Sequence, residues 1–557
     1  MFVDTGAIGE QLHSVFPVRI IWQSDHAVIN SQWLTNQRIS QPLQSDSRPA
    51  CVLEPGGALL IDFGCELNGS VELAVGAPVA QIDPLPALRL RLGESASEAM
   101  AELGERNAGN DYAVRDDTVM MPWLGVRSFG PSGFRFLRID CAGQIPVPLT
   151  HVRAVLALRN VEPSGSFRCS DQEVTRIWEV GAWTTRLNLQ HHLWDGIKRD
   201  RLVWLGDLQP AAGAVQAIFG PDPAIERSLD LIRDCTPIGS WMNGISSYSL
   251  WWILIHERWW WGKGDRAYLE EQRTYLAGLT ALLLNAMDAS GREQLGGMRF
   301  IDWPSAGVDA TVSAGLQALL CLALGAGSRM LSILGDAPRA EQCAAGAARA
   351  RRAGQAPSAS KAIAGLQALA GMIPSDPAAL RILEGGARGM TAFLGGFALE
   401  TLARAGRVDR GLAIMRGYWG AMIERGATSF WEEFDVDWLE GSGRIDELPD
   451  PGQRDLHGDF GRFGHAGFRM SLCHAWSVAP TAWLSENVLG IRPASPGLAS
   501  VSITPQLGML DWAEGRYPTP HGLIWVRHER KNGTIESEIS LPDGVGRAAD
   551  GAGTKVL

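Results

Sequence analysis

Residues 170–181 read Ser-Asp-Gln-Glu-Val-Thr-Arg-Ile-Trp-Glu-Val-Gly, and the hydrophobic pattern of the chain changes at this point. Ser170 followed by Glu173 is typical of a helix N-terminus, because the two side chains can cap the first free backbone amides. Val174, Ile177 and Trp178 then follow at helical spacing. Before this stretch apolar residues alternate, whereas after it they follow the helical period. The stretch therefore divides a β region from a helical region.

The region before the stretch is predicted to be all-β. Short alternating runs recur there, including residues 58–63, 69–75, 88–92, 134–140 and 152–158, and Gly and Pro clusters separate them. Strands at this spacing predict a β-sandwich. A similar pattern returns after about residue 486, with a turn signal at Lys531-Asn-Gly. The predicted domains are an N-terminal β-sandwich at 1–160, a helical domain at 161–485 and a C-terminal β-sandwich at 486–557.

The helical region is rich in Ala and Leu with short polar breaks. Residues 340–352 and 358–372 predict two helices joined by a break at Gly354 and Pro357, which is an αα-hairpin. About 325 residues provide room for roughly 12 helices of average length. No tetratricopeptide or ankyrin repeat is present, so a single helical toroid is the simpler interpretation.

Composition excludes several classes of function. The 557 residues carry 50 Lys and Arg against 61 Asp and Glu, a net charge of −11, which disfavours nucleic acid as a partner. The eight Cys form no short pair, so neither a disulfide framework nor a zinc site is predicted, and no cofactor is expected. Apolar stretches are shorter than the roughly 18 residues of a membrane span. With no basic leader at the N-terminus, a cytoplasmic location is expected, or a periplasmic one if a leader has been removed.

Tryptophan is unusually frequent. The chain has 21 Trp against 6 Tyr, and 16 of the Trp lie between residues 161 and 485. Trp can fill a large core, and it can also stack on the C–H faces of sugar rings in a cleft. The concentration in one region favours several Trp in a cleft, with core packing as the alternative for any single one.

The densest functional stretch is residues 195–207, Asp-Gly-Ile-Lys-Arg-Asp-Arg-Leu-Val-Trp-Leu-Gly-Asp. Arg forks can hold sugar hydroxyls or orient carboxylates, and Trp204 can supply a stacking wall. Three shorter stretches carry further candidates: Trp431-Glu432-Glu433, Asp302-Trp303 and Ser471-Leu-Cys-His474. The alternatives are a solvated charged loop for residues 195–207, an acidic turn for Trp431-Glu432-Glu433 and a core histidine for His474. Separated carboxylates with abundant Trp are the groups that glycosidic bond cleavage requires.

These motifs resemble those of family 78 glycoside hydrolases, the α-L-rhamnosidases. Residues 195–207 match the family's Asp-Cys-Pro-Gln-Arg-Glu-Arg-Leu-Gly-Trp-Thr-Gly-Asp motif at Asp195, Arg199, Arg201, Leu202, Trp204, Gly206 and Asp207. Residues 426–432 match its Gly-Ala-Thr-Thr-x-Trp-Glu motif, and Asp302-Trp303 and Ser471–His474 match two shorter segments. The resemblance implies a multidomain fold with a central all-α (α/α)6 barrel between N-terminal and C-terminal β-sandwich domains.

The resemblance also implies an inverting mechanism with Asp200 as general acid and Glu432 as general base. The residues implied to hold the sugar are Asp195, Arg199, Trp204, Asp207, Asp302, Trp303, Trp431 and His474. Two positions depart from the family. Asp200 stands where the family has Glu, which shortens the acid by one methylene, and Lys198 stands where it has Gln.

The sequence thus predicts an exo-acting, inverting hydrolase that releases α-L-rhamnose from oligosaccharides or glycosides, acting as a monomer or homodimer with carbohydrate as its partner. Lys198, together with His256, Arg258 and Lys263, is expected near the cleft, which favours an acidic aglycone such as a uronate. Two alternatives stay open: a uronate-directed lyase that would use Lys198, Arg199 and a Tyr or His, and a non-catalytic sugar-binding relative.

Overall fold

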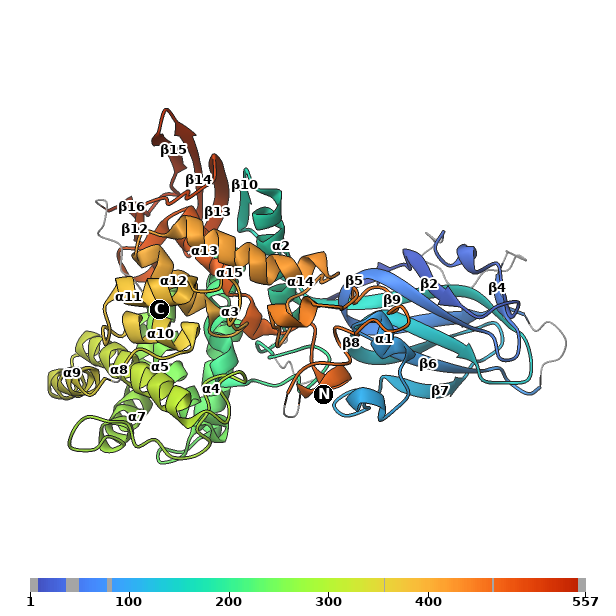
Figure 1. Ribbon diagram of the computed structural model, residues 1–557, viewed down its shortest axis with the longest axis horizontal. Helices are drawn as coiled ribbons and strands as arrows, with labels where there is room; N and C mark the ends of the chain where they lie inside the picture. Colours follow the sequence, from blue (N-terminus) through green and yellow to red (C-terminus); the bar gives the residue numbers. More distant parts are fainter. Residues whose placement is uncertain (1–8, 37–49, 78–82, 355, 463–464, 549–557) are drawn as a thin grey trace, which may run out of the picture.

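The computed structural model describes residues 9–36, 50–77, 83–354, 356–462 and 465–548. The first eight residues, on which the leader prediction partly rests, lie outside the described residues. An N-terminal β domain lies at one end of the molecule, a helical domain at the other, and the C-terminal strands lie against the helices (Figure 1). The predicted order of β, helical and β regions is confirmed.

Three long antiparallel strands form the centre of the N-terminal domain: β5 (Ala58–Val75), β8 (Gly125–Cys141) and β9 (Val147–Arg159). The predicted runs 58–63 and 69–75 form the single strand β5, whose pairing with β8 shifts register twice. Such bulges bend a strand. The other elements are β1 (Glu10–Val15), β2 (Arg19–Gln23), β3 (Val28–Ile29), β4 (Cys51–Leu53), β6 (Ala87–Gly93), β7 (Asp116–Met120) and helix α1 (Ala96–Met100).

The N-terminal domain packs directly on the loop that carries the 195–207 motif. Leu187, Ile197 and Cys473 belong to the same buried apolar cluster as the strands of this domain. At Gly133 of β8, an added Cβ would lie 2.6 Å from the backbone nitrogen of Lys198. Only glycine permits so close an approach of two backbones. The β domain therefore forms part of the support of the motif loop.

Helix α2 (Gln172–Asn188) begins within the predicted stretch, but its cap is Asp171 and not the predicted Ser170, and Asp171 accepts hydrogen bonds from two backbone amides. The two helices predicted at 340–352 and 358–372 are present as α9 and α10, but α9 packs mainly against α8, and α10 packs against α8, α11 and α12, so the predicted αα-hairpin is wrong. The helices that follow α2 are α3 (Leu208–Phe219), α4 (Pro223–Cys235), α5 (Ser246–Lys263), α6 (Arg266–Glu271), α7 (Arg273–Asn285), α8 (Asp309–Ile333), α9 (Ala337–Arg352), α10 (Lys361–Leu369), α11 (Ser375–Leu383), α12 (Gly395–Arg404), α13 (Val408–Met415), α14 (Ala421–Glu424) and α15 (Ala479–Trp483).

Helix α8 is the most apolar long helix among the described residues. Its 25 residues include a window with a mean hydropathy of 1.6, long and apolar enough to cross a membrane. However, 72% of that window is buried inside the protein, where α8 packs against α5 and α9. Its apolar surface is thus covered by other helices, as in the core of a globular domain.

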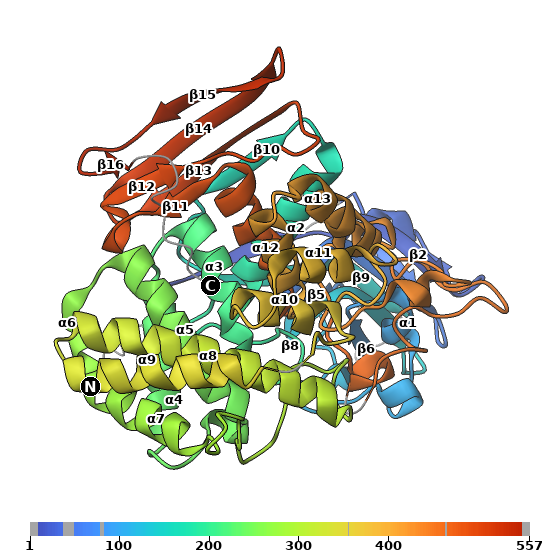
Figure 2. The same cartoon turned by 60° about the vertical axis from the view of Figure 1, so that its left-hand side comes forward.

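Two sheets form the C-terminal region. One contains β10 (Ser166–Cys169), β13 (Trp512–Thr519), β14 (Gly522–Lys531) and β15 (Thr534–Ser540), and it covers one side of the helical domain (Figure 2). The other contains β11 (Ile491–Pro493), β12 (Ser500–Ile503) and β16 (Gly546–Arg547). Strand β10 pairs with β13, although the sequence pattern placed it in the helical domain. The helices and these sheets share one apolar core.

Candidate active site

A pocket of about 290 Å³ lies at the end of the helical domain that faces the N-terminal β domain. Loops from the 195–207 motif and from residues 298–303 and 465–476 line it, together with Tyr112 of the β domain. The lining residues are Tyr112, Asp195, Arg199, Asp200, Trp204, Asp207, Asn243, Ile245, Tyr248, Met298, Phe300, Trp303, Glu432, His465, Arg469, His474 and Trp476.

The structure brings together eight of the ten predicted site residues on this wall: Asp195, Arg199, Asp200, Trp204, Asp207, Trp303, Glu432 and His474. The other two, Asp302 and Trp431, do not line the pocket and are almost completely buried. Asp302 accepts a hydrogen bond from the backbone of Ser305, whereas its second oxygen has no partner among the described residues. Asp302 and Trp431 are therefore placed behind the wall.

A strained turn sets the orientation of the two central motif residues. Asp200 and Arg201 both have left-handed backbone conformations, with φ of 59° and 56°. Such conformations are costly for residues other than glycine and persist only where surrounding contacts hold them. Here Arg201 donates a hydrogen bond to the carbonyl of Ile197 at 2.9 Å and lies over the ring of Trp194. The turn leaves Arg199 and Asp200 on the pocket wall.

Glu432 is the most strongly held carboxylate in the pocket. Nη2 of Arg199 lies 2.6 and 2.7 Å from its two oxygens, and the backbone amide of Ser471 donates to Oε2 at 3.0 Å. Nδ1 of His465 lies 3.2 Å from Oε1, and Nε2 of His474 lies 3.9 Å from it. Burial acts to raise the pKa of Glu432, but the Arg199 guanidinium, with the neighbouring rings of His465 and His474, outweighs it and holds the pKa well below its usual value. Glu432 is therefore an anion at neutral pH.

Asp200 lies on the outer side of the pocket. Its Oδ2 accepts a hydrogen bond from Nε1 of Trp204 at 2.9 Å, and its Oδ1 lies 3.4 Å from Nη1 of Arg199. Tyr112, which is 51% exposed at the pocket mouth, has its pKa raised by burial and by the charge of Asp200. One guanidinium group thus contacts both Asp200 and Glu432. Its width limits the separation of their nearest oxygens to at most roughly 8 Å, which admits both the ~5–5.5 Å of retaining and the ~6.5–9.5 Å of inverting glycosidases.

Two further carboxyl groups lie deep in the pocket. Asp207 accepts a hydrogen bond from the hydroxyl of Tyr248 at 2.7 Å, and burial raises its pKa to about 8. Asp195 accepts a hydrogen bond from the backbone of Leu202 at 3.0 Å, and burial raises its pKa well above the usual value. Protonated carboxyl groups can both donate and accept hydrogen bonds. The base of the pocket is therefore suited to an uncharged, hydroxyl-rich ligand.

Aromatic and apolar side chains form the remaining wall. Trp204 packs edge-on against Tyr248, and Phe300 packs against Trp303. Three of the 21 Trp line the pocket, whereas Trp251, Trp252, Trp419 and Trp431 are among the largest fully buried side chains. Core packing is thus the role of several Trp, and a smaller group faces the pocket as expected.

The sequence did not predict the contributions of Tyr112, Asn243, Tyr248, His465 and Arg469. Tyr248 lies in apolar helical sequence and shows no pattern that separates it from a core residue. Tyr112 lies in a polar loop of another domain. A single Tyr, Asn or His becomes a site residue only through its tertiary position.

The predicted cationic mouth is wrong for the residues named. Lys198, whose side chain is only 11% exposed, is paired with Glu94 at 3.0 Å and with Glu98 at 3.2 Å. The other three are also absent from the pocket wall: His256 is buried against its own helix, Arg258 pairs with Glu486, and Lys263 pairs with Glu226. Each found a partner outside the cleft. Among the described lining residues the arginines are Arg199 and Arg469.

Paired carboxylates and aromatic walls at one end of a helical domain are typical of glycoside hydrolases. Comparison with known families agrees. Residues 162–357 match the bacterial α-L-rhamnosidase six-hairpin glycosidase domain, and residues 490–548 match the bacterial α-L-rhamnosidase C-terminal domain. The resemblance to family 78 α-L-rhamnosidases that the motifs predicted is therefore confirmed.

Individual relatives agree with these matches. An α-L-rhamnosidase of Alteromonas sp. (strain LOR) is 30% identical over 158 residues, which are 27% of this chain and 15% of that protein. The structure of a family 78 rhamnosidase of Bacillus sp. GL1 has a TM-score of 0.71 and 22% identity, covering 91% of this chain and 53% of that one. A rhamnosidase of Klebsiella oxytoca with rhamnose bound has a TM-score of 0.65 and 20% identity, covering 86% of this chain and 96% of that one. The chain thus spans about half of the Bacillus enzyme.

Proposed function

We propose that this protein is an exo-acting, inverting α-L-rhamnosidase that releases a terminal α-L-rhamnose from small glycosides or oligosaccharides. The observation that carries the proposal is the pair of carboxylates, Asp200 and Glu432, on one pocket wall with Arg199 between them. The two family matches support the same activity. We further infer that the helices close into an (α/α)6 barrel, the architecture that a six-hairpin domain implies.

Asp200 acts as the general acid in this proposal. The aglycone must leave through the pocket mouth, and Asp200 lies on that side, next to the exposed Tyr112. The hydrogen bond from Trp204 fixes one oxygen of Asp200, and the other oxygen, which lies 3.4 Å from Nη1 of Arg199, would protonate the glycosidic oxygen. The deeper Asp207 already accepts a hydrogen bond from Tyr248 and is less suited to reach a leaving group. A positioned acid of this kind typically accelerates cleavage by about 10²–10⁴-fold.

Glu432 acts as the general base, which takes a proton from the attacking water. Its anionic form is secured by Arg199, yet a carboxylate of very low pKa is a weak base. We infer that Arg199 turns partly toward the sugar hydroxyls when substrate binds, which releases one oxygen of Glu432 for the water. Glu433 is the neighbouring carboxyl group but does not line the pocket, in keeping with the choice of Glu432.

The pocket fits a neutral deoxy sugar. Burial raises the pKa of both Asp195 and Asp207, which favours their protonated forms as hydrogen-bonding partners of ring hydroxyls, while Trp204 offers an aromatic face. Rhamnose carries a methyl group in place of a hydroxymethyl group. Ile245, Met298 and other apolar side chains of the wall are suited to that methyl group.

Hydrolysis of p-nitrophenyl α-L-rhamnoside, compared with a panel of other p-nitrophenyl glycosides, tests the proposed activity. Proton NMR of the first product tests the mechanism. Initial release of β-L-rhamnose is the expected result, because a water attacks from the face opposite the aglycone. Initial release of α-L-rhamnose would exclude inversion and the role of Glu432 as base. No rhamnosidase activity on any substrate of the panel would contradict the proposed function.

The lyase alternative loses one of its two named cations, because Lys198 is paired with glutamates outside the pocket, and the other, Arg199, lines the pocket but is paired with Glu432. Elimination would produce a rise in absorbance at 235 nm with uronate-containing oligosaccharides, and we expect none. A non-catalytic sugar-binding protein would bind rhamnose without turnover in the same assays.

A further inference from the structure

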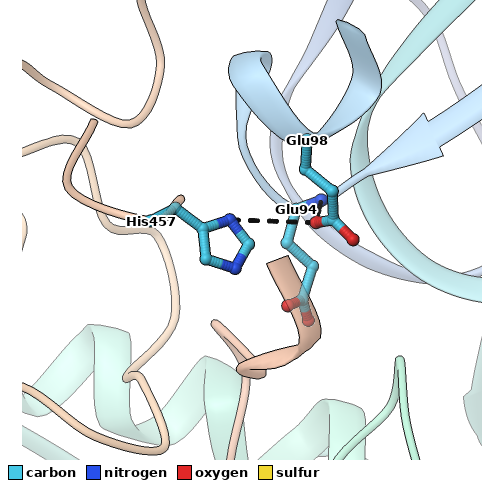
Figure 3. A group of neighbouring side chains, drawn as sticks. All are labelled: Glu94, Glu98 and His457. Atoms are coloured by element: carbon cyan, nitrogen blue, oxygen red, sulfur yellow. Dashed lines mark hydrogen bonds and ion pairs between the residues drawn. The ribbon is translucent and has the colours of Figure 1, made fainter. Parts of the chain in front are cut away.

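A buried group of charged side chains lies where the N-terminal β domain meets the catalytic loops. Glu94 follows β6, Glu98 lies in α1, and His457 comes from the helical domain (Figure 3). Their possible ligand atoms lie within 4.8 Å of one another, as in a metal site. All three side chains are almost fully buried. Buried carboxylates without a counter-charge would destabilise the fold, so a positive group is required.

The counter-charge is supplied by Lys198. Its Nζ lies 3.0 Å from Glu94 and 3.2 Å from Glu98, and it also donates hydrogen bonds to the carbonyls of Phe468 and Met470 at 2.8 and 2.7 Å. His457 has partners for both ring nitrogens, the hydroxyl of Ser95 and the carbonyl of Met470. The ammonium group of Lys198 already supplies the positive charge, and both ring nitrogens of His457 already have partners. The cluster therefore lacks the features of a metal site.

Lys198 and Glu94 both hold the segment that contacts Glu432. Lys198 fixes the carbonyl groups before Ser471, while Glu94 accepts hydrogen bonds from the Ser471 hydroxyl at 3.3 Å and from the Leu472 amide at 2.6 Å. The Ser471 amide, held in this way, donates to Oε2 of Glu432 at 3.0 Å. In return the amide of Glu432 donates to the Ser471 carbonyl at 2.9 Å.

The same lysine also lies next to Arg199, which makes the other main contact with Glu432. Lys198 directly precedes Arg199, whose guanidinium group contacts both oxygens of Glu432. The backbone here is close-packed against Gly133 of the β domain. Lys198 therefore anchors two separate backbone segments that between them supply the Arg199 and Ser471 hydrogen bonds to one carboxylate.

We propose that Lys198, Glu94 and Glu98 form an interdomain clamp that positions Glu432. In this way the N-terminal β domain contributes to the geometry of the active site. The three are positioning residues, since none of them touches the pocket. The inference rests on the proposed role of Glu432. Functional groups usually need a supporting layer of fixed partners to keep their geometry, and this layer comes from another domain.

The main test compares Lys198→Met, which removes the charge at similar length, with Lys198→Arg and with a matched control, Arg19→Met. Arg19 also joins the β domain to the helical domain, through Asp446 at 2.9 Å, but lies outside the pocket. Lys198→Met should lower kcat by about 10–100-fold, the size of effect found when the hydrogen-bond partners of metal ligands are removed, with a much smaller change in KM. Lys198→Arg should recover part of the loss, and Arg19→Met should leave kcat unchanged.

The pH profile separates positioning from a general loss of stability. The charged and titratable groups around Glu432 are Arg199, His465, His474, Asp200, Asp207, Glu433 and Tyr248. These remain in Lys198→Met, but the Ser471 hydrogen bond weakens, so the pKa of Glu432 should rise. The acidic limb of kcat should therefore move to higher pH in Lys198→Met and stay in place in Arg19→Met. A folded Lys198→Met enzyme with unchanged kcat and an unchanged acidic limb would overturn the proposal.

Two measurements keep the test decisive. If Lys198→Met does not fold, Glu94→Gln replaces it, because that change keeps the side-chain shape and should produce the same shift of the acidic limb. The rate of hydrogen–deuterium exchange in residues 468–473 reports, without any substrate, how firmly the clamp holds this segment. Exchange should accelerate in the clamp variants and not in Arg19→Met. Unchanged exchange would overturn the clamp, whereas a wild-type protein without rhamnosidase activity would contradict only the proposed function.

Discussion

One terminal nitrogen of Arg199 lies 2.6 and 2.7 Å from the two oxygens of Glu432, although the two residues come from distant parts of the chain. Both side chains are nearly excluded from solvent. In such surroundings the pair is strongly coupled, because removing one partner leaves the other charged and unpaired. The contact therefore fixes both the ionisation and the orientation of Glu432.

The first prediction concerns this contact. Arg199→Met should raise the pKa of Glu432, since burial then acts without its main opposing charge. The acidic limb of kcat/KM should move to higher pH, and activity at neutral pH should fall steeply. Arg199→Lys should shift the limb less, because the charge remains and only the planar geometry is lost. A pH–rate profile unchanged in both variants would show that Arg199 does not control Glu432.

The second prediction separates acid from base. Asp200→Asn should slow natural glycosides by about 10²–10⁴-fold and largely spare p-nitrophenyl rhamnoside, whose leaving group needs no proton. Glu432→Gln should slow both substrates, because every substrate requires an activated water. Asparagine tolerates the left-handed conformation of residue 200, so Asp200→Asn should keep the melting temperature of the wild type. Equal losses on both substrates in Asp200→Asn would exclude Asp200 as the proton donor.

The third prediction divides the two roles of Trp204. The Trp204→Phe change removes the hydrogen bond to Asp200 and keeps an aromatic face, so kcat on natural glycosides should fall while KM changes little. Trp204→Ala also removes the face and should raise KM more than about tenfold, since desolvated aromatic contacts contribute on the order of 1–2 kcal/mol. Steady-state kinetics of the two variants provide the measurement. If the phenylalanine and alanine variants have the same KM, Trp204 does not contact the sugar.

The fourth prediction uses the pKa of Asp207, which burial raises to about 8. The folded protein binds this proton more tightly than the unfolded chain, so stability should fall as pH rises from the unfolded pKa of about 4 towards 8. The variant Asp207→Asn cannot ionise at this position and should lose this part of the pH dependence. Thermal melting at pH 5, 7 and 9 should therefore show the variant gaining stability relative to the wild type as the pH rises. A constant difference between the two proteins across this range would contradict the raised pKa.

Much of the architecture follows from the local pattern of the sequence. The change of period at residues 170–181 correctly separated β from helical regions, because local hydrophobic spacing reflects which face of an element is buried. The contiguous motif 195–207 placed five side chains on the pocket wall correctly: Asp195, Arg199, Asp200, Trp204 and Asp207. Residues close in sequence on one loop reach the same pocket with little help from the rest of the fold.

The tertiary structure decided the partners of the charged residues. Lys198 was predicted to face the cleft, yet it lies between Glu94, Glu98 and two backbone carbonyls that other parts of the chain supply. Tyr112 reaches the pocket from a separate domain, and β10 joins a sheet formed by strands more than 300 residues later. Pairing between distant segments produces no periodic pattern in the sequence, so hydrophobic spacing does not reveal it. The sequence therefore determined which elements form and which loop carries the chemistry, and only the packed structure determined which charges meet.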